Sequence, residues 1–179
     1  MTVLNQTDDK SRVLNEHNLL LFAGAPGDTI QFAEFIQANV QLYGMKNDTE
    51  LNSDAVAAFT RKEMADNLRT RVVPDVEHDI DGKSAYQLQM ILAGYNILTK
   101  KPTLNWIDEL GTRASVPYCA HGYGAYYTMS IFDRYHRDDI SYEEGVDIIQ
   151  KCIFELEKRL PISSGGYLYE PSFSELISC

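Results

Sequence analysis

Cys119 and His121 are the residues of this chain that come closest to a catalytic pair, and Asp133 follows them. A thiol beside an imidazole can become a nucleophile, because the imidazole can remove its proton. Such pairs usually meet through the fold rather than through adjacency in sequence. Two interpretations therefore stand, a catalytic thiol or a small buried residue next to a structural histidine, and the pattern favours the second.

A glycine-rich step follows directly, with Gly122, Tyr123 and Gly124 ahead of a helical pattern. The start of a helix can bind an anion through its free N–H groups. This step lacks the full spacing of a dinucleotide- or phosphate-binding loop, so a tight turn from strand to helix is favoured. The dense tyrosines around Tyr126 are typical of a core or an interface.

The remaining histidines and cysteines show no metal-ligand spacing. Three histidines are scattered along the chain: His17, His78 and His136. The cysteines are odd in number and widely spaced: Cys119, Cys152 and Cys179. This pattern predicts neither a disulfide framework nor a metal site. We expect no cofactor, and reduced thiols in the cytoplasm or the nucleus.

The composition is that of a soluble globular chain. The 179 residues suit a single domain over residues 1–179, and 44% are hydrophobic and 23% charged. The formal net charge of −10 would repel a phosphate backbone, so nucleic acid is not expected as a partner. No stretch has the apolar length of a membrane span, and residues 1–11 are polar, unlike a signal peptide.

The first half of the chain has the pattern of one strand and two helices. Residues 19–23 form an apolar run closed by a turn, which predicts a buried strand. Asp28 is the expected N-cap of a first helix, and a second helix is expected from Asn52 or Ser53. Residues 72–84 combine proline, glycine and four acidic residues, which predicts an exposed, mobile loop insertion.

The second half has the pattern of three strands and two helices. The strands are expected at residues 86–93, 103–107 and 113–116. A third helix follows the glycine-rich step, and Ser141 with Glu144 has capping-box spacing at the start of a fourth. The order of elements predicts a mixed α/β (α+β) fold, with sheets sandwiched between helix pairs.

Five segments keep the order that they have in one known family: residues 22–37 (FAGAPGDTIQFAEFIQ), 39–43 (NVQLY), 91–95 (ILAGY), 120–125 (AHGYGA) and 131–135 (IFDRY). They resemble beta subunits of the 20S proteasome, of the beta-4 kind (also called beta type 2). The resemblance extends over about residues 3–161 and is broken by one loop. The shared order of the segments makes it specific.

The resemblance implies a four-layer αββα sandwich of the N-terminal nucleophile hydrolase type. It also implies a seat in the heptameric beta ring of the core particle, between beta-3 and beta-5 type neighbours. An alpha ring and the opposite beta ring are the further partners implied. The implied role is that of a structural subunit in ubiquitin-dependent protein degradation, in the cytoplasm and the nucleus.

The resemblance implies, in addition, that the chain has no protease site of its own. Active members use an N-terminal threonine as the nucleophile, and Thr2 does not fall at that position. Lys10 falls at the family's catalytic lysine and is interpreted as a vestige. Tyr123 stands where active members have a serine, and Leu160 where they have an aspartate. Ser163 matches the family's remaining serine.

Three departures from the family pattern are expected. The N-terminal strand pair, roughly 10–20 residues, is missing ahead of the strand at 19–23; residues 72–84 are an insertion; and residues 162–179 form a divergent tail. Without its partners that strand would leave an open edge, and the chain alone would be aggregation-prone. Two alternatives remain: a stand-alone hydrolase of the same fold that uses Cys119 or another nucleophile, and a truncated paralogue that does not assemble.

Overall fold

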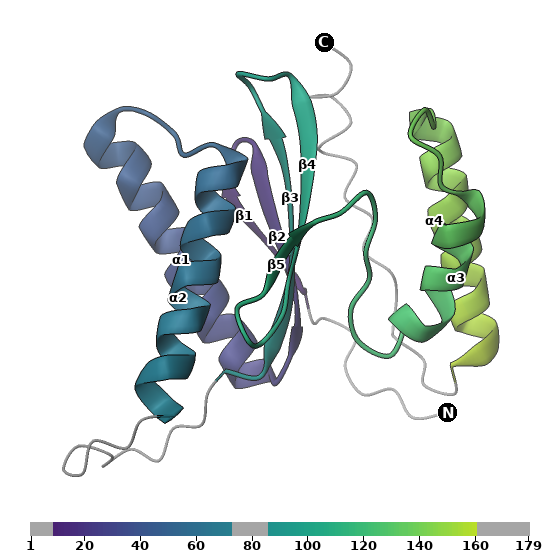
Figure 1. Cartoon of the computed structure of the whole chain (residues 1–179), viewed down its shortest axis with the longest axis horizontal. Coiled ribbons are helices and arrows are strands. Elements are labelled where there is room, and N and C mark those ends of the chain that lie inside the picture. The colour runs from purple at the N-terminus through teal and green to yellow at the C-terminus, as the bar shows by residue number, and fades with distance from the viewer. Residues whose placement is uncertain (1–8, 73–85, 161–179) are drawn as a thin grey trace. The chain divides into compact units, whose positions relative to one another are not determined.

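The computed structural model describes residues 9–72 and 86–160, which divide into two compact units (Figure 1). The first unit holds residues 11–116, and the second holds the described residues outside that range. The first unit contains β1 (Ser11–Asn15), β2 (Asn18–Gly24), α1 (Pro26–Asn47), α2 (Ser53–Val72), β3 (Leu88–Asn96), β4 (Lys101–Ile107) and β5 (Arg113–Ser115). The second contains α3 (Ala125–Tyr135) and α4 (Tyr142–Arg159).

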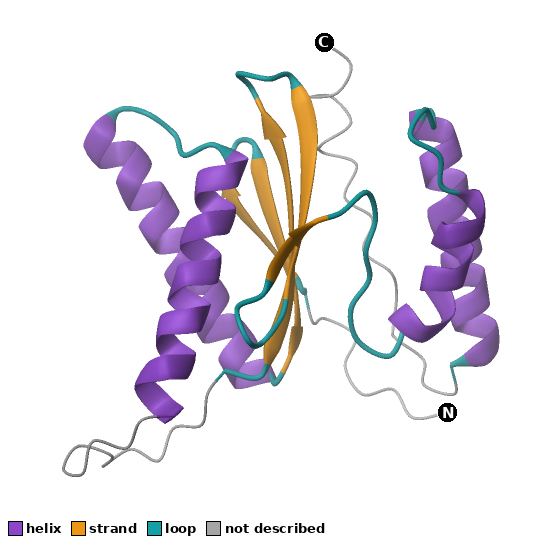
Figure 2. Cartoon of the chain, viewed as in Figure 1, coloured by secondary structure: helices purple, strands orange, loops and turns teal. Residues whose placement is uncertain are grey.

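The strands of the first unit form one antiparallel sheet in the order β1-β2-β3-β4-β5. Helices α1 and α2 both pack on this sheet and lie on the same side of it (Figure 2). The predicted mixed α/β (α+β) character is confirmed, and the predicted strands correspond to β2 to β5 with ends shifted by a few residues. Of the two sheets that the family resemblance implies, the described residues form this one.

The core of the first unit lies between the sheet and the two helices. Every second residue of β3 is buried, so that Leu88, Met90 and Leu92 join the core from one face of the strand. On α1 the buried positions Ile36 and Val40 recur at helical spacing. Full burial of each such side chain stabilises the fold by about 1.5–3 kcal/mol. The other buried members are Leu14, Leu20, Phe22, Phe32, Ala33, Val56, Ala57, Met64 and Ile107.

Strand β1 is an element that the sequence pattern did not predict. It pairs with β2 from Ser11↔Leu21 to Asn15↔Asn18, with a register shift near its end. Strand β2 therefore has a partner on each side, because it also pairs with β3. The expectation that the strand at 19–23 lacks partners is wrong. An open edge on this strand therefore gives no reason to expect aggregation of the isolated chain.

Helix α1 begins at Pro26, ahead of the expected N-cap Asp28. Proline is favoured at the first helical position, because its φ is already helical and its missing N–H is not needed there. The carboxylate of Asp28 instead accepts a hydrogen bond from the backbone N–H of Gln87 at 3.1 Å. Asp28 thus ties α1 to the segment ahead of β3. The predicted start of α2 at Ser53 is confirmed.

In the second unit α3 packs against α4, which begins with the predicted capping box. The Oγ of Ser141 accepts from the Glu144 N–H at 3.3 Å, and the Glu144 carboxylate accepts from the Ser141 N–H at 2.9 Å. No helix that the structure describes is long and apolar enough to cross a membrane.

Several predicted features lie outside the described residues. They are Thr2, His78, the tail at 162–179 with Ser163 and Cys179, and all of the loop at 72–84 except Val72. Val72 itself is the last residue of α2.

Candidate functional site

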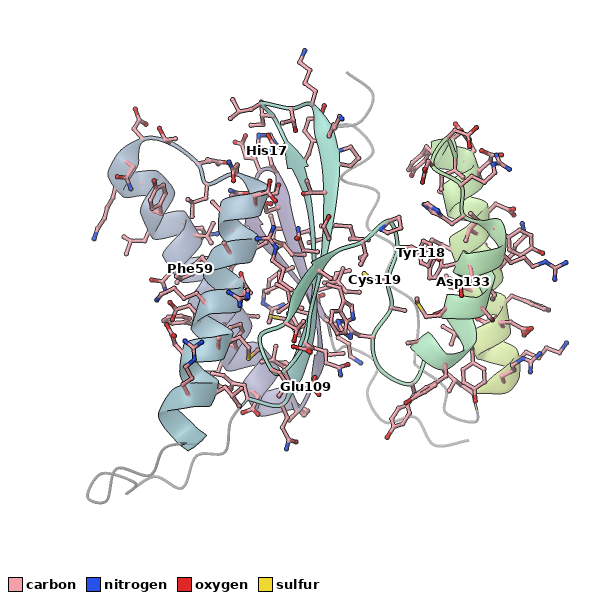
Figure 3. All side chains as sticks on the ribbon, viewed as in Figure 1. His17, Phe59, Glu109, Tyr118, Cys119 and Asp133 are labelled. Atoms are coloured by element: carbon pink, nitrogen blue, oxygen red, sulfur yellow. The ribbon has the colours of Figure 1, made fainter. Side chains whose placement is uncertain are left out.

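Tyr118, just ahead of α3, is joined to side chains from the C-terminal end of that helix. Its phenol donates a hydrogen bond to Asp133 Oδ1 at 2.5 Å. Its ring stacks on Phe132 with the centroids 5.4 Å apart, and lies 4.9 Å from the ring of His136. Figure 3 labels Tyr118 and Asp133 where the incoming segment meets α3. Asp133, which follows the Cys119–His121 pair in the sequence, thus accepts a hydrogen bond from the Tyr118 phenol.

The hydrogen bond also controls the protonation of Tyr118. Because the neutral phenol donates to a carboxylate, the pKa of Tyr118 is raised above its ordinary value. Desolvation and the negative charge of Asp133 raise this pKa further. The phenol therefore stays protonated at neutral pH and cannot act there as a general base. The cluster holds the segment ahead of α3 in place.

Cys119 follows Tyr118 and is only partly accessible. Burial raises the pKa of its thiol to about 11. The thiolate is the nucleophilic form, and with this pKa only about one molecule in ten thousand carries it at pH 7. The structure therefore favours Cys119 as a small, partly buried residue over Cys119 as a catalytic thiol.

The glycine-rich step forms a tight turn into α3, as predicted, but the turn does not follow a strand directly, because β5 ends at Ser115. Gly122 has a φ of 70°, in the left-handed region that favours glycine. A Cβ at this position would meet nothing within 4 Å, so the backbone conformation and not crowding calls for glycine. The Ala125 N–H donates to the Gly122 carbonyl at 3.2 Å. Tyr123, between the two glycines, is 80% exposed.

Among the positions that the family resemblance compares with catalytic residues, the structure describes Lys10, Tyr123 and Leu160. Lys10 is exposed and directly precedes β1. Within residues 9–72 and 86–160, no hydrogen bond or ion pair joins Lys10 to Cys119 or Tyr123. Leu160 follows the last residue of α4, and its N–H donates to the Leu156 carbonyl at 2.8 Å. An aliphatic side chain there can neither accept nor donate a proton.

An open groove of about 760 Å³ lies between α3 and α4. Two of its cations lie over an aromatic ring: Lys151 Nζ is 4.6 Å and Arg134 Cζ 5.5 Å from the centroid of Tyr135. The serine hydroxyl in the groove, Ser130 Oγ, donates a hydrogen bond to the Tyr127 carbonyl at 3.1 Å. The other lining residues are Tyr126, Ile131, Gln150, Phe154, Glu155 and Arg159. The groove offers an aromatic and cationic contact surface rather than a nucleophile held by a base.

Sequence reasoning missed the link between Tyr118 and Asp133, since no local periodicity connects the two positions. The sequence did hold a partial signal for this cluster. Asp133 and His136 stand three residues apart at the end of α3, a spacing that puts two side chains on one side of a helix. In the ranges that the structure describes, no three His, Cys, Asp or Glu side chains are arranged to hold a metal ion.

Comparison with known proteins assigns the chain to a family. The family model described as "Proteasome subunit" matches residues 1–168. A probable proteasome subunit beta type-4 of Meyerozyma guilliermondii is 47% identical over 167 residues, which are 93% of this chain and 80% of the relative. The proteasome subunit beta type-4 of Saccharomyces cerevisiae is 44% identical over 168 residues, 94% of this chain and 79% of the relative.

A plant relative extends the match beyond fungi. The proteasome subunit beta type-2-A of Arabidopsis thaliana is 36% identical over 161 residues, 90% of this chain and 72% of the relative. The resemblance to beta subunits of the beta-4 kind, predicted from the residue pattern, is confirmed. Over nearly its whole length, from β1 to the end of α4, this chain is a member of the proteasome subunit family.

Proposed function

We propose that the chain is a structural, non-catalytic beta subunit of the 20S proteasome core particle. Its role is to complete a beta ring and brace neighbouring subunits for ubiquitin-dependent protein degradation. The names of its fungal relatives, proteasome subunits beta type-4, support this proposal, and the chain aligns with about four fifths of their length.

The absence of catalysis is proposed on one observation: Cys119 and Tyr123 lack the properties of an activated nucleophile. Acyl transfer needs a nucleophile activated by a base within hydrogen-bond reach. The Cys119 thiol has a pKa of about 11, and Tyr123 stands largely exposed at the position of a family serine. Lys10 is then a vestige of the family lysine, because neither Cys119 nor Tyr123 supplies a serine or threonine hydroxyl for it to activate.

The proposed partners are beta-3 and beta-5 type neighbours, the alpha ring and the opposite beta ring, and the proposed location is the cytoplasm and the nucleus. Large apolar side chains exposed on the helices support association with other chains. Phe35 and Met45 on α1 are 46% and 76% exposed, and Phe154 on α4 is 64% exposed.

The experiment is to express the tagged full chain in Saccharomyces cerevisiae and to separate the lysate by size. We expect the chain to co-migrate with core particles, with proteasome subunits identified in the same fraction by mass spectrometry. The purified chain alone should not cleave fluorogenic peptides. A chain that stays outside the particles, and whose peptide turnover disappears in Cys119→Ala, would contradict the proposal and favour a stand-alone hydrolase.

A further inference from the structure

The turn between β3 and β4 exposes two adjacent aliphatic side chains. Ile97 is 56% exposed and Leu98 is 86% exposed, the highest exposure among the large hydrophobic residues that the structure describes. Exposed single hydrophobic residues are common on protein surfaces. A neighbouring pair at the end of a projecting element is a feature of binding surfaces.

The β3–β4 hairpin overhangs the rest of its sheet. The last pair between β2 and β3 is Asn18↔Gly94, whereas β3 and β4 remain paired as far as Asn96↔Lys101. Figure 1 shows the tip of this hairpin reaching past the turn between β1 and β2. The tip therefore extends beyond the strand that supports its base, which makes it accessible to another chain.

The conformation of the tip is held by a buried side chain. Asn96, which is 7% exposed, accepts hydrogen bonds through Oδ1 from the N–H groups of Leu98 at 3.0 Å and Thr99 at 3.2 Å. A turn fixed in this way presents its side chains in one arrangement and loses little conformational entropy on binding. The tip is thus pre-organised for contact.

The charge of the hairpin is opposite to that of the chain. Lys100 and Lys101 are both exposed, and residues 95–107 contain no acidic residue. The chain as a whole has a formal net charge of −10. Complementary potential is what selects a partner and its orientation at an interface. A surface that receives this tip should therefore combine an apolar pocket with carboxylates at its rim.

We propose that the β3–β4 tip inserts Ile97 and Leu98 into an apolar pocket, rimmed by carboxylates, on an adjoining proteasome subunit. This inference rests on the proposed function and names the surface and the partner chemistry for it. A protein partner fits better than an anionic lipid surface, because two lysines cannot offset the repulsion of a chain with charge −10.

The test compares incorporation of tagged full-length variants into core particles in Saccharomyces cerevisiae. The double variant Ile97→Asp/Leu98→Asp should reduce incorporation at least tenfold, as expected when a central apolar anchor is lost. Leu110→Asp is the matched control, because Leu110 is 62% exposed in another turn; it should change incorporation less than twofold. Thermal melts of the purified variants should agree with that of the unchanged chain.

Two further measurements identify the partner chemistry. Lys100→Glu/Lys101→Glu should also lower incorporation, because like charges would then face each other across the contact. A photo-crosslinking amino acid at position 98 should link the chain to one proteasome subunit, at a peptide that contains carboxylate side chains.

The outcomes separate the two proposals. If the unchanged chain fails to enter core particles, the proposed function is wrong and this inference falls with it. If the unchanged chain and the Ile97→Asp/Leu98→Asp variant enter equally, the proposed function stands and the tip is not an anchor. Binding of the unchanged chain to vesicles with about 30% phosphatidylserine, lost in the double variant, would overturn the assignment of a protein partner.

Discussion

The phenol of Tyr118 donates a 2.5 Å hydrogen bond to Asp133, and so fastens the segment ahead of α3 to the end of that helix. The glycine-rich turn lies between these two anchored points. We predict that Tyr118→Phe, which keeps the ring but removes the donor, speeds amide hydrogen exchange in residues 118–124. Tyr126→Phe, at an 85% exposed tyrosine, is the control. Equal exchange in both variants would show that the bond does not restrain the segment.

The same hydrogen bond predicts a pH dependence at the alkaline end. The pKa of Tyr118 is raised by its bond to Asp133, so its contribution to stability is complete below the ordinary phenol pKa of about 10. That contribution is lost as pH rises through the raised value. The difference in melting temperature between the unchanged chain and Tyr118→Phe should therefore be constant up to about pH 10 and shrink above it. A difference that grows with pH would contradict the assignment.

Cys119 should react slowly with alkylating reagents. Because burial raises the pKa of its thiol to about 11, its reaction with iodoacetamide should keep accelerating above pH 9. In a chain with Cys152 and Cys179 changed to alanine, the pH–rate profile is measured before and after unfolding in urea. The unfolded thiol should show a midpoint near 8.5, its ordinary value. Coincident profiles would mean that the fold does not shelter this thiol.

Two glycines should respond in opposite directions to alanine. A Cβ on Gly94 would lie 2.3 Å from Ser53 Oγ and 2.4 Å from Asn18 Oδ1, both in fully buried residues. Gly94→Ala should therefore lower the free energy of unfolding by about 1–3 kcal/mol. Gly44 lies in α1 with nothing within 4 Å of such a Cβ, so Gly44→Ala should raise it by about 0.5–1 kcal/mol. Urea titrations of both variants check the two signs.

The capping box of α4 should carry measurable stability. Ser141→Ala removes the acceptor for the Glu144 N–H and should cost about 0.5–2 kcal/mol of unfolding free energy. Ser141→Asn retains a side-chain acceptor and should recover most of that loss. If alanine and asparagine behave alike in thermal melts, the cap does not limit the stability of this helix.

Features that depend on residues close together in the chain could be predicted from the sequence. The capping box needs only Ser141 and Glu144 at the correct spacing, because its bonds lie within one helical turn. The strand at 19–23 needs a short apolar run with a turn after it, and the fold class follows from the order of such elements. The family followed from segments that keep a shared order.

Only the tertiary structure decided which distant groups meet and which apolar groups stay uncovered. Strand β1 is stabilised by pairing with the edge of β2. Asp28 does not cap its helix, and its carboxylate accepts a hydrogen bond from the Gln87 N–H. Ile97 and Leu98 have the same apolar character as core residues but stand in solvent. Burial and hydrogen bonding depend on what the rest of the chain places nearby, and residue type alone does not contain that information.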